Sequence, residues 1–392
     1  MLSSPITLIG AQIRDSDARS VRILESRIVS LGAPPQPGDR VLDLGGARLL
    51  PGLINAHDHL QLNSIPQLEP TKLYLNVQQW IADVNRRRRA DPEYEAQIAM
   101  ALERRLVIGG IKNLLSGVTT VAHHDAFFPA LLDPQYPIHV MRRYGWSHSL
   151  CIDGAQKVRT SHRGTPSKWP WIIHAAEGVD EAAAAEFDRL ESIGCIARNT
   201  LIVHGIALNA AERARLIEAQ AALVWCPSSN MRLFGRTATV GDLIAAGRVA
   251  LGSDSRMSGA RDLLDELRIA GELVPIDESR LEALVTGDSA RLLRLPDRGV
   301  IAVGARADLL VLPARLQLSQ ASRSDIHLLL RDGRVCYGDR EFAAQLMPAT
   351  EWVEVWVDGA AKILSAGIAG LVRQSRASEP GIDIPAAQWR AA

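Results

Sequence analysis

Two of the ten histidines in this chain of 392 residues stand one residue apart, in the string HDH. His57 and His59 follow the apolar run LLPGLINA, which we expect to form a strand. Because side chains alternate along a strand, both imidazoles point to the same side at its C-terminal end. Two imidazoles in this arrangement can chelate a transition metal.

Three further polar residues end apolar runs elsewhere in the chain: His174 ends WPWIIH, His204 ends TLIVH and Asp254 ends RVALGSD. Imidazoles and a carboxylate around one cavity suit Zn²⁺ or Fe²⁺ and leave a position for water, whose pKa the metal brings toward ~7. Glu177 follows shortly after His174, so its carboxylate can face that water and carry protons without binding the metal.

The elements that precede these residues must position them. Runs at residues 117–124, 170–178, 199–208, 221–229 and 248–255 are apolar on both faces, which is typical of buried parallel strands. Amphipathic segments, such as residues 180–194, separate the runs. The alternation predicts an α/β fold, a TIM-like (β/α)8 barrel over residues 51–299, with a doubly wound open sheet as the alternative. In a barrel the C-terminal strand ends share one mouth, so the five candidate residues would meet there.

The two ends of the chain have a different residue pattern from the region between them. Residues 1–50 and 300–345 contain short runs typical of strands, separated by Gly, Pro and Asp, and we expect them to form one composite β-sandwich domain. Residues 346–392 are interpreted as a C-terminal extension, a strand and a helix that end in a loose tail over the last dozen residues.

The composition limits the kinds of partner that the protein is expected to bind. There are 44 Lys+Arg and 44 Asp+Glu residues, which give a formal net charge of +0 and argue against a nucleic-acid partner. The N-terminus lacks a basic region followed by an unbroken apolar stretch, and no window of about 18 residues is apolar and uncharged. We therefore expect a cytoplasmic protein with no membrane partner. A homodimer is the default oligomer, because two-fold assemblies are the commonest.

Seven strings in the chain are similar, in their order, to those of a known family. They resemble the metal-dependent amidohydrolase superfamily, and within it the branch of chlorohydrolases and amino-heterocycle deaminases. The resemblance covers roughly residues 45–315. The strings are PGLINAHDHL, GVTTVAHHD, IIHAAEG, TLIVHGIAL, CPSSN, ALGSDS and SARLLRL followed by GVIAVGARADLLVL.

The resemblance implies a (β/α)8 barrel with a composite β-sandwich and one divalent metal ion, Zn²⁺ or alternatively Fe²⁺. Glu177 matches the family's proton-shuttle carboxylate, and His204 matches the histidine that contacts the attacked group. Asp254 is expected to act also as a base toward the metal-bound water. The implied metal ligands are His57, His59, His174 and Asp254.

The chain departs from the family pattern in two respects. Branches with two metals use a carbamylated lysine on a barrel strand, but no lysine here ends a predicted strand, so we expect one metal. The lysines are Lys72, Lys112, Lys157, Lys168 and Lys362. The segment between His124 and His174 is also shorter than is typical of deaminases in this branch. We predict that four residues outside the metal set bind substrate: His124, His148, Asn230 and Arg232.

These observations predict a hydrolase that attacks an sp² ring carbon of a nitrogen heterocycle with metal-bound hydroxide and releases ammonia. An aminated purine, pyrimidine or triazine is the expected substrate. Hydrolysis of a cyclic amide with ring opening, or dechlorination, would use the same site. An inactive binding or scaffold barrel is the alternative of another class, and a phosphotriesterase-like enzyme would need the bridging lysine.

Overall fold

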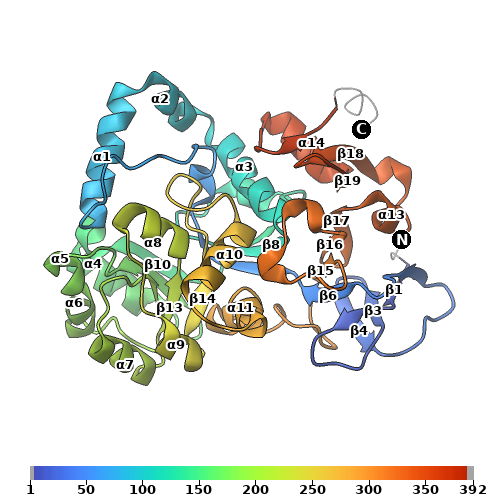
Figure 1. Ribbon diagram of the computed structural model, residues 1–392, viewed down its shortest axis with the longest axis horizontal. Coiled ribbons are helices and arrows are strands. Elements are labelled where there is room, and N and C mark those ends of the chain that lie inside the picture. The colour runs from blue at the N-terminus through green and yellow to red at the C-terminus, as the bar shows by residue number, and fades with distance from the viewer. Residues whose placement is uncertain (1–3, 386–392) are drawn as a thin grey trace.

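The computed structural model describes residues 4–385 and shows a barrel of parallel strands beside two further sheets (Figure 1). The barrel strands follow one another in sequence order, in the sheets β7-β8-β9 and β10-β11-β12-β13-β14, and all the pairs are parallel. A parallel bridge between Asp58 and Asp254 connects the end of β7 to the end of the β14 segment. The strands are β7 (Leu53–Asp58), β8 (Val118–His123), β9 (His139–Val140), β10 (Gly145–Ser149), β11 (Trp171–Ala175), β12 (Thr200–His204), β13 (Ala222–Trp225) and β14 (Val249–Leu251).

This strand order confirms the predicted barrel. A doubly wound sheet reverses its strand order at a switch point, whereas these strands proceed in sequence order from β7 to β14 and then return to β7. Six of the barrel strands, β7, β8 and β11 to β14, are buried on both faces, as their apolar composition predicted. Six of them contribute to one buried cluster, through Ile54, Ala122, Ile172, Val203, Val224 and Ala250.

Helices surround the barrel except in one sector. After β8, residues 124–138 contain the short 3₁₀ turn η2 (Pro129–Leu132), and only residues 141–144 separate β9 from β10. The set of crossover helices expected for a (β/α)8 barrel is therefore incomplete between β8 and β10. This region belongs to the segment between His124 and His174, which is shorter than is typical of the resembled deaminases. The helices are α1 (Val77–Ala90), α2 (Pro92–Ala99), α3 (Leu102–Leu115), α4 (Leu150–Gly164), α5 (Glu181–Ala184), α6 (Glu186–Ser192), α7 (Ala210–Glu218), α8 (Pro227–Phe234), α9 (Gly241–Ala245), α10 (Leu263–Leu273), α11 (Glu278–Leu284), α12 (Gly287–Leu292), α13 (Arg340–Ala343) and α14 (Ala366–Ser375).

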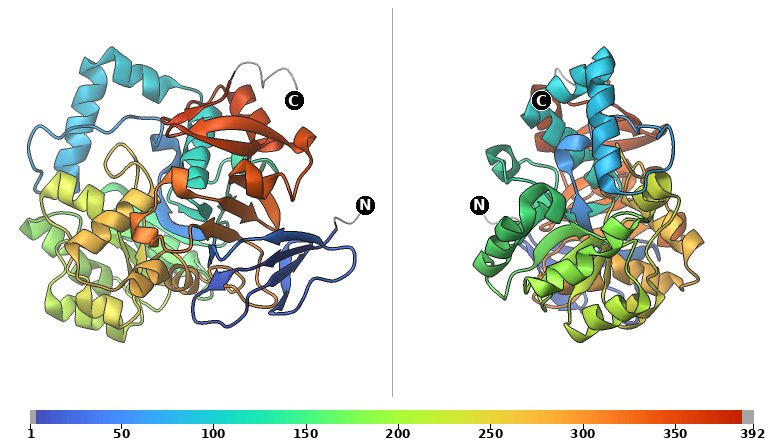
Figure 2. Two further views of the ribbon diagram at one scale, coloured as in Figure 1. Left: turned by 45° about the vertical axis from the view of Figure 1, so that its right-hand side comes forward. Right: turned by 90° about the vertical axis from the view of Figure 1, so that its left-hand side faces the viewer.

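Strands from both ends of the chain pair beside the barrel (Figure 2). Strand β6 runs antiparallel to β15, with Pro51 opposite Leu309, so the N-terminal and C-terminal segments share a sheet. We call this eight-stranded sheet the composite sheet. Its order is β2 (Gln12–Ile13), β6 (Arg48–Pro51), β15 (Leu309–Leu312), β16 (Leu328–Arg331), β17 (Arg334–Gly338), β19 (Ala360–Ser365), β18 (Trp352–Val357) and β20 (Ile382–Asp383).

A second sheet packs against the composite sheet. It has the order β4 (Arg27–Leu31), β3 (Val21–Leu24), β1 (Ile6–Ile9) and β5 (Arg40–Asp43). Leu8 and Leu42 from this sheet lie in one apolar cluster with Leu309 and Leu330 from the composite sheet. The exact domain boundaries given above stay predictions.

The C-terminal segment is more ordered than we expected. Ile382 pairs with Val357 of β18, so the expectation of a loose tail is wrong for β20, while residues 386–392 lie outside the described residues. Just before β20, the carboxylate of Glu379 is buried between two guanidinium groups, those of Arg256 and Arg323, and its Oε1 lies 2.9 Å from Nη2 of Arg323. Among residues 4–385, none of the helices has both the length and the apolar character needed to cross a membrane.

Candidate metal centre

The five strand-end residues meet at the mouth of the barrel, and all are buried. His57 belongs to β7 and His59 follows it directly. His174 lies in β11, His204 ends β12, and Asp254 follows β14. The C-terminal ends of parallel barrel strands therefore bring together residues that are up to 197 positions apart, 254 minus 57.

Four ligand atoms form a closed ring. Nε2 of His174 lies 3.2 Å from Nε2 of His57 and 3.3 Å from Nε2 of His59. Oδ1 of Asp254 lies 3.5 Å from Nε2 of His57 and 3.7 Å from Nε2 of His59. Ligands about 2.1 Å from a tetrahedral zinc ion stand about 3.4 Å apart, so these spacings suit a single ion of that size.

The hydrogen bonds of His174 and His204 leave the Nε2 lone pair of each ring free. Nδ1 of His174 lies 2.9 Å from the carbonyl oxygen of His148, which can only accept, so the proton of His174 sits on Nδ1. Nδ1 of His204 donates in the same way to Oδ1 of Asn230 at 2.8 Å, while Nδ2 of Asn230 donates to Thr237. An imidazole that donates through Nδ1 is oriented to offer Nε2 to a metal or a ligand.

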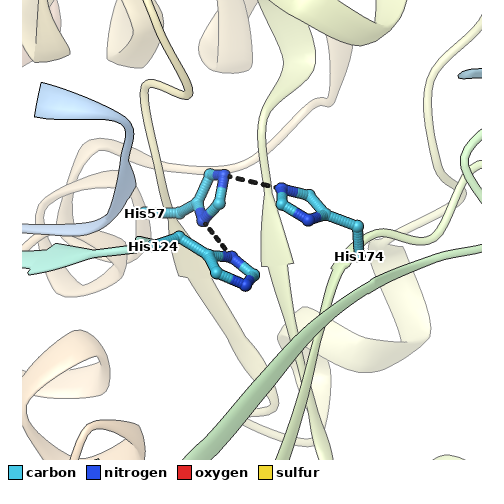
Figure 3. A group of neighbouring side chains, drawn as sticks. All are labelled: His57, His124 and His174. Atoms are coloured by element: carbon cyan, nitrogen blue, oxygen red, sulfur yellow. Dashed lines mark hydrogen bonds between the residues drawn. The ribbon is translucent and has the colours of Figure 1, made fainter. Parts of the chain in front are cut away.

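His57 is oriented by a hydrogen bond to the neighbouring His124 (Figure 3). Nε2 of His124 lies 3.0 Å from the carbonyl oxygen of Ser147, so it carries the proton and leaves Nδ1 of His124 as an acceptor. Nδ1 of His57 lies 3.3 Å from that acceptor and must therefore donate to it. The lone pair of His57 then sits on Nε2, the atom that faces His174.

The backbone turns sharply where two of these residues sit. His204 has φ of 72° and Asp254 has φ of 53°, both in the left-handed region that disfavours residues with a side chain. Such conformations cost about 1–3 kcal/mol each and are concentrated at functional sites. The turns redirect the chain at the ends of the strands and bring both side chains to the mouth.

Burial favours the neutral form of His57, His174 and His124, and neutral imidazole is the form that binds metals. It lowers the pKa of His57 to about 4, and it lowers the pKa of His174 and of His124 well below the ordinary value. The pKa of Asp254 is lowered although burial alone would raise it, and Oδ2 of Asp254 accepts a hydrogen bond from Oγ of Ser258 at 2.6 Å.

The pKa of Glu177 is shifted in the opposite direction. Burial, reinforced by the charges of Asp254 and Glu186, raises the pKa of Glu177 well above its ordinary value. Oε1 of Glu177 lies 3.6 Å from Nε2 of His204. The site thus holds one carboxyl group whose pKa is raised, Glu177, beside one whose pKa is lowered, Asp254, and such a pairing is typical of acid and base roles.

The predicted substrate-binding residues fall into three positions. His148 is partly exposed and its ring centroid lies 4.9 Å from that of His174, so it borders the mouth. His124 and Asn230 are fully buried behind His57 and His204. Arg232 has an acidic partner, since its Nη2 lies 2.6 Å from Oε1 of Glu69.

One charged group near the site was overlooked in the sequence. Lys112 on α3 is fully buried and lies 3.2 Å from Oδ2 of Asp58, the residue between His57 and His59. It ends no predicted strand, so the rule that locates the other site residues does not find it. The signal that could have revealed it is a single charge within the apolar helical string LVIGGIKNLL. Among the described residues, two groups have ligand atoms close enough together to hold a metal ion: His57 with His124 and His174, and His57 with His204 and Asp254. The buried ion pair of Lys112 and Asp58 lies beside them.

Comparison with known proteins agrees with this geometry. The family model described as "Amidohydrolase family" matches residues 170–361. A 5-methylthioadenosine/S-adenosylhomocysteine deaminase of Halobacterium salinarum is 27% identical over 380 residues, covering 80% of this chain and 86% of the relative. An 8-oxoguanine deaminase of Pseudomonas aeruginosa is 26% identical over 455 residues, covering 96% of this chain and 97% of the relative.

Solved structures share the fold at lower identity. A zinc-bound adenosine deaminase from Xanthomonas campestris superposes with a TM-score of 0.71 at 18% identity, covering 95% of this chain and 97% of that one. A mutant atrazine chlorohydrolase from Arthrobacter aurescens TC1, complexed with zinc and atraton, gives a TM-score of 0.69 at 18% identity, covering 84% and 94%.

The barrel, its strand-end residues and these matches define a class. The chain is similar to the amidohydrolase superfamily and, within it, to proteins named as deaminases and to a chlorohydrolase structure. These matches confirm the expected class of enzyme, a hydrolase that acts on carbon–nitrogen bonds, and they agree with the resemblance found in the sequence.

Proposed function

We propose that the protein is an aminohydrolase that depends on one divalent metal ion, Zn²⁺ in the first instance. His57, His59, His174 and Asp254 would hold the ion. The observation that carries the proposal is the ring of four ligand atoms spaced 3.2–3.7 Å apart. The hydrogen bonds of His57 and His174 leave a lone pair toward the centre of this ring. When bound, such an ion acts as a Lewis acid and brings the pKa of water toward ~7.

Glu177 and Asp254 divide the proton transfer. The lowered pKa of Asp254 suits it to take a proton from water, and the raised pKa of Glu177 suits it to give a proton to a departing amino nitrogen. Reaction then proceeds by attack of water oxygen on an sp² ring carbon, cleavage of the carbon–nitrogen bond and release of ammonia. Glu177 is buried, which keeps bulk water from exchanging this proton.

The family resemblance implies that His204 contacts the attacked group, and the hydrogen bonds of His204 suggest how. Its proton lies on Nδ1, toward Asn230, so the neutral ring presents an acceptor at Nε2. We propose that Nε2 accepts a hydrogen bond from an N–H or O–H group at the attacked carbon. Asn230 then orients His204 instead of binding substrate itself, and His124 orients His57. Of the four substrate-binding predictions, His148 retains that role.

An aminated heterocycle fits this site. Two sequence relatives that cover most of this chain carry the names of purine or nucleoside deaminases. The described site residues are mainly neutral imidazoles, which suit an uncharged ring. We therefore propose an amino-purine, amino-pyrimidine or amino-triazine as the substrate class.

The test is an ammonia assay of zinc-loaded protein against a panel of such rings. We expect ammonia release from at least one ring, lost in Glu177→Gln. A product with the ring opened and no free ammonia would instead identify a cyclic-amide hydrolase. No turnover of any panel member by zinc-loaded protein would contradict the proposed substrate class.

A further inference from the structure

A buried ion pair lies directly beneath the strand ends that carry three of the proposed ligands. Nζ of Lys112 donates to Oδ2 of Asp58 at 3.2 Å, to Oδ1 of Asn63 at 2.8 Å and to Oγ of Ser253 at 3.1 Å. An ammonium group has three protons, so these three acceptors satisfy it completely. Neither charged side chain has exposed surface.

The carboxylate of Asp58 also has several hydrogen-bond donors. Besides Lys112, it accepts from Nδ2 of Asn63 and Nδ2 of Asn113, both at 2.7 Å, and from Nδ2 of Asn55 at 3.2 Å. A buried polar network whose members all have partners is rigid and specifies one arrangement. Asp58 cannot change position without leaving several of these donors unpaired.

The network joins two strand ends that otherwise share few bonds. The amide of Asp254 donates to the carbonyl of His57 and the amide of His59 donates to the carbonyl of Asp254, each at 3.1 Å. These two bonds lie on either side of Asp58. Lys112 binds Asp58 on one segment and Ser253, the neighbour of Asp254, on the other.

We propose that Lys112 is a positioning residue for the metal centre. Its ammonium group holds Asp58 and Ser253 together and so fixes His57 and His59 relative to Asp254. This inference rests on the proposed function, because it concerns the metal that those residues would hold. Without Lys112, the buried carboxylate of Asp58 has no cationic partner. Asp58 must then move or take up a proton, and either change displaces the imidazoles of His57 and His59. Partners that orient metal ligands typically change metal affinity 10–100-fold when they are lost.

The test measures metal binding by the full-length protein without using activity. The zinc dissociation constant is measured by competition with a chromophoric chelator, and the visible absorption of bound Co²⁺ reports the ligand geometry. We expect Lys112→Met to weaken zinc binding 10–100-fold and to alter the Co²⁺ spectrum.

Lys362→Met is the matched control. Lys362 is also a buried lysine with an acidic partner, since its Nζ lies 2.5 Å from Oδ1 of Asp339 in the composite sheet. Its loss should reduce the free energy of unfolding but leave the zinc constant and the Co²⁺ spectrum unchanged. An equal loss of zinc affinity in Lys362→Met would overturn the inference, because general destabilisation would then explain both results.

A double variant keeps the test decisive even where Lys112→Met does not fold. Asp58→Asn combined with Lys112→Met removes both charges and leaves no unpaired ion. Because Lys112 acts through Asp58, the double variant should bind zinc more weakly than the wild type but no more weakly than Lys112→Met. Wild-type zinc affinity in the double variant overturns the inference. A wild-type protein that binds no zinc would contradict the proposed function itself, a result separate from those of the variants.

Discussion

Nδ1 of His124 lies 3.3 Å from Nδ1 of His57, and the bond from His124 to the carbonyl of Ser147 decides which of the two nitrogens carries the proton. His57 is therefore the donor, and its Nε2 is free for a metal. His124 thus affects the metal centre through the orientation and basicity of His57.

His124→Phe should weaken zinc binding 10–100-fold while one ion per chain still binds, because the orienting bond to His57 is lost and the ligands remain. A chelator-competition titration measures this change. His162→Phe is a suitable control, since that ring packs against Trp171 at a centroid distance of 4.9 Å, outside the ligand ring. Complete loss of zinc from His124→Phe would make His124 a ligand, and unchanged affinity would remove its orienting role.

Glu177→Gln should reduce kcat by about 10²–10⁴-fold without loss of metal, because the amide keeps the shape of the side chain but cannot transfer a proton. Ammonia release at saturating substrate, together with elemental analysis of the same sample, measures both quantities. Retained turnover in this variant would show that another group carries the proton.

Glu266 on α10 should make the folded state pH-sensitive. Burial is the main cause that raises its pKa to about 7, from an ordinary value near 4.5. Between these two values the folded state binds more protons than the unfolded state, so stability falls as pH rises, by up to about 3 kcal/mol from this group. Urea unfolding of the metal-free protein at pH 4.5 and pH 8 should show that Glu266→Gln is relatively more stable at pH 8. A difference between variant and wild type that does not change with pH would contradict this.

Glu379→Ala should lower the free energy of unfolding by about 3–5 kcal/mol, because it leaves Arg256 and Arg323 without a buried carboxylate that both now bind. Chemical denaturation measures this loss. The control is Glu354→Ala, which removes an exposed partner of Arg340 and should cost less than about 1 kcal/mol. Equal effects in the two variants would show that the Glu379 contacts contribute little.

The strand-end residues could be predicted because a barrel imposes one geometric rule. Each apolar run ends with its polar residue on the same rim, so His57, His174 and Asp254 converge whatever the lengths of the intervening helices. The segment between His124 and His174 is shorter than is typical of the resembled branch, and the set of crossover helices is incomplete within it.

The partners of those residues could not be predicted in this way. Lys112 reaches Asp58 from a helix 54 residues further along the chain, and Asn230 reaches His204 from α8. Such contacts depend on how each helix is rotated against the barrel, which alternation of apolar runs does not determine. Arg232 shows the same limit: its position after a strand indicated substrate binding, but could not indicate that its guanidinium pairs with Glu69.

The most direct test of the metal centre is elemental analysis of protein purified without chelators, compared with His57→Ala. The account predicts about one zinc or iron ion per wild-type chain and none in the variant, with circular dichroism showing that the variant remains folded. A metal-free wild type after zinc loading, or a full complement of metal in His57→Ala, would contradict it, and the first result would favour a binding or scaffold barrel.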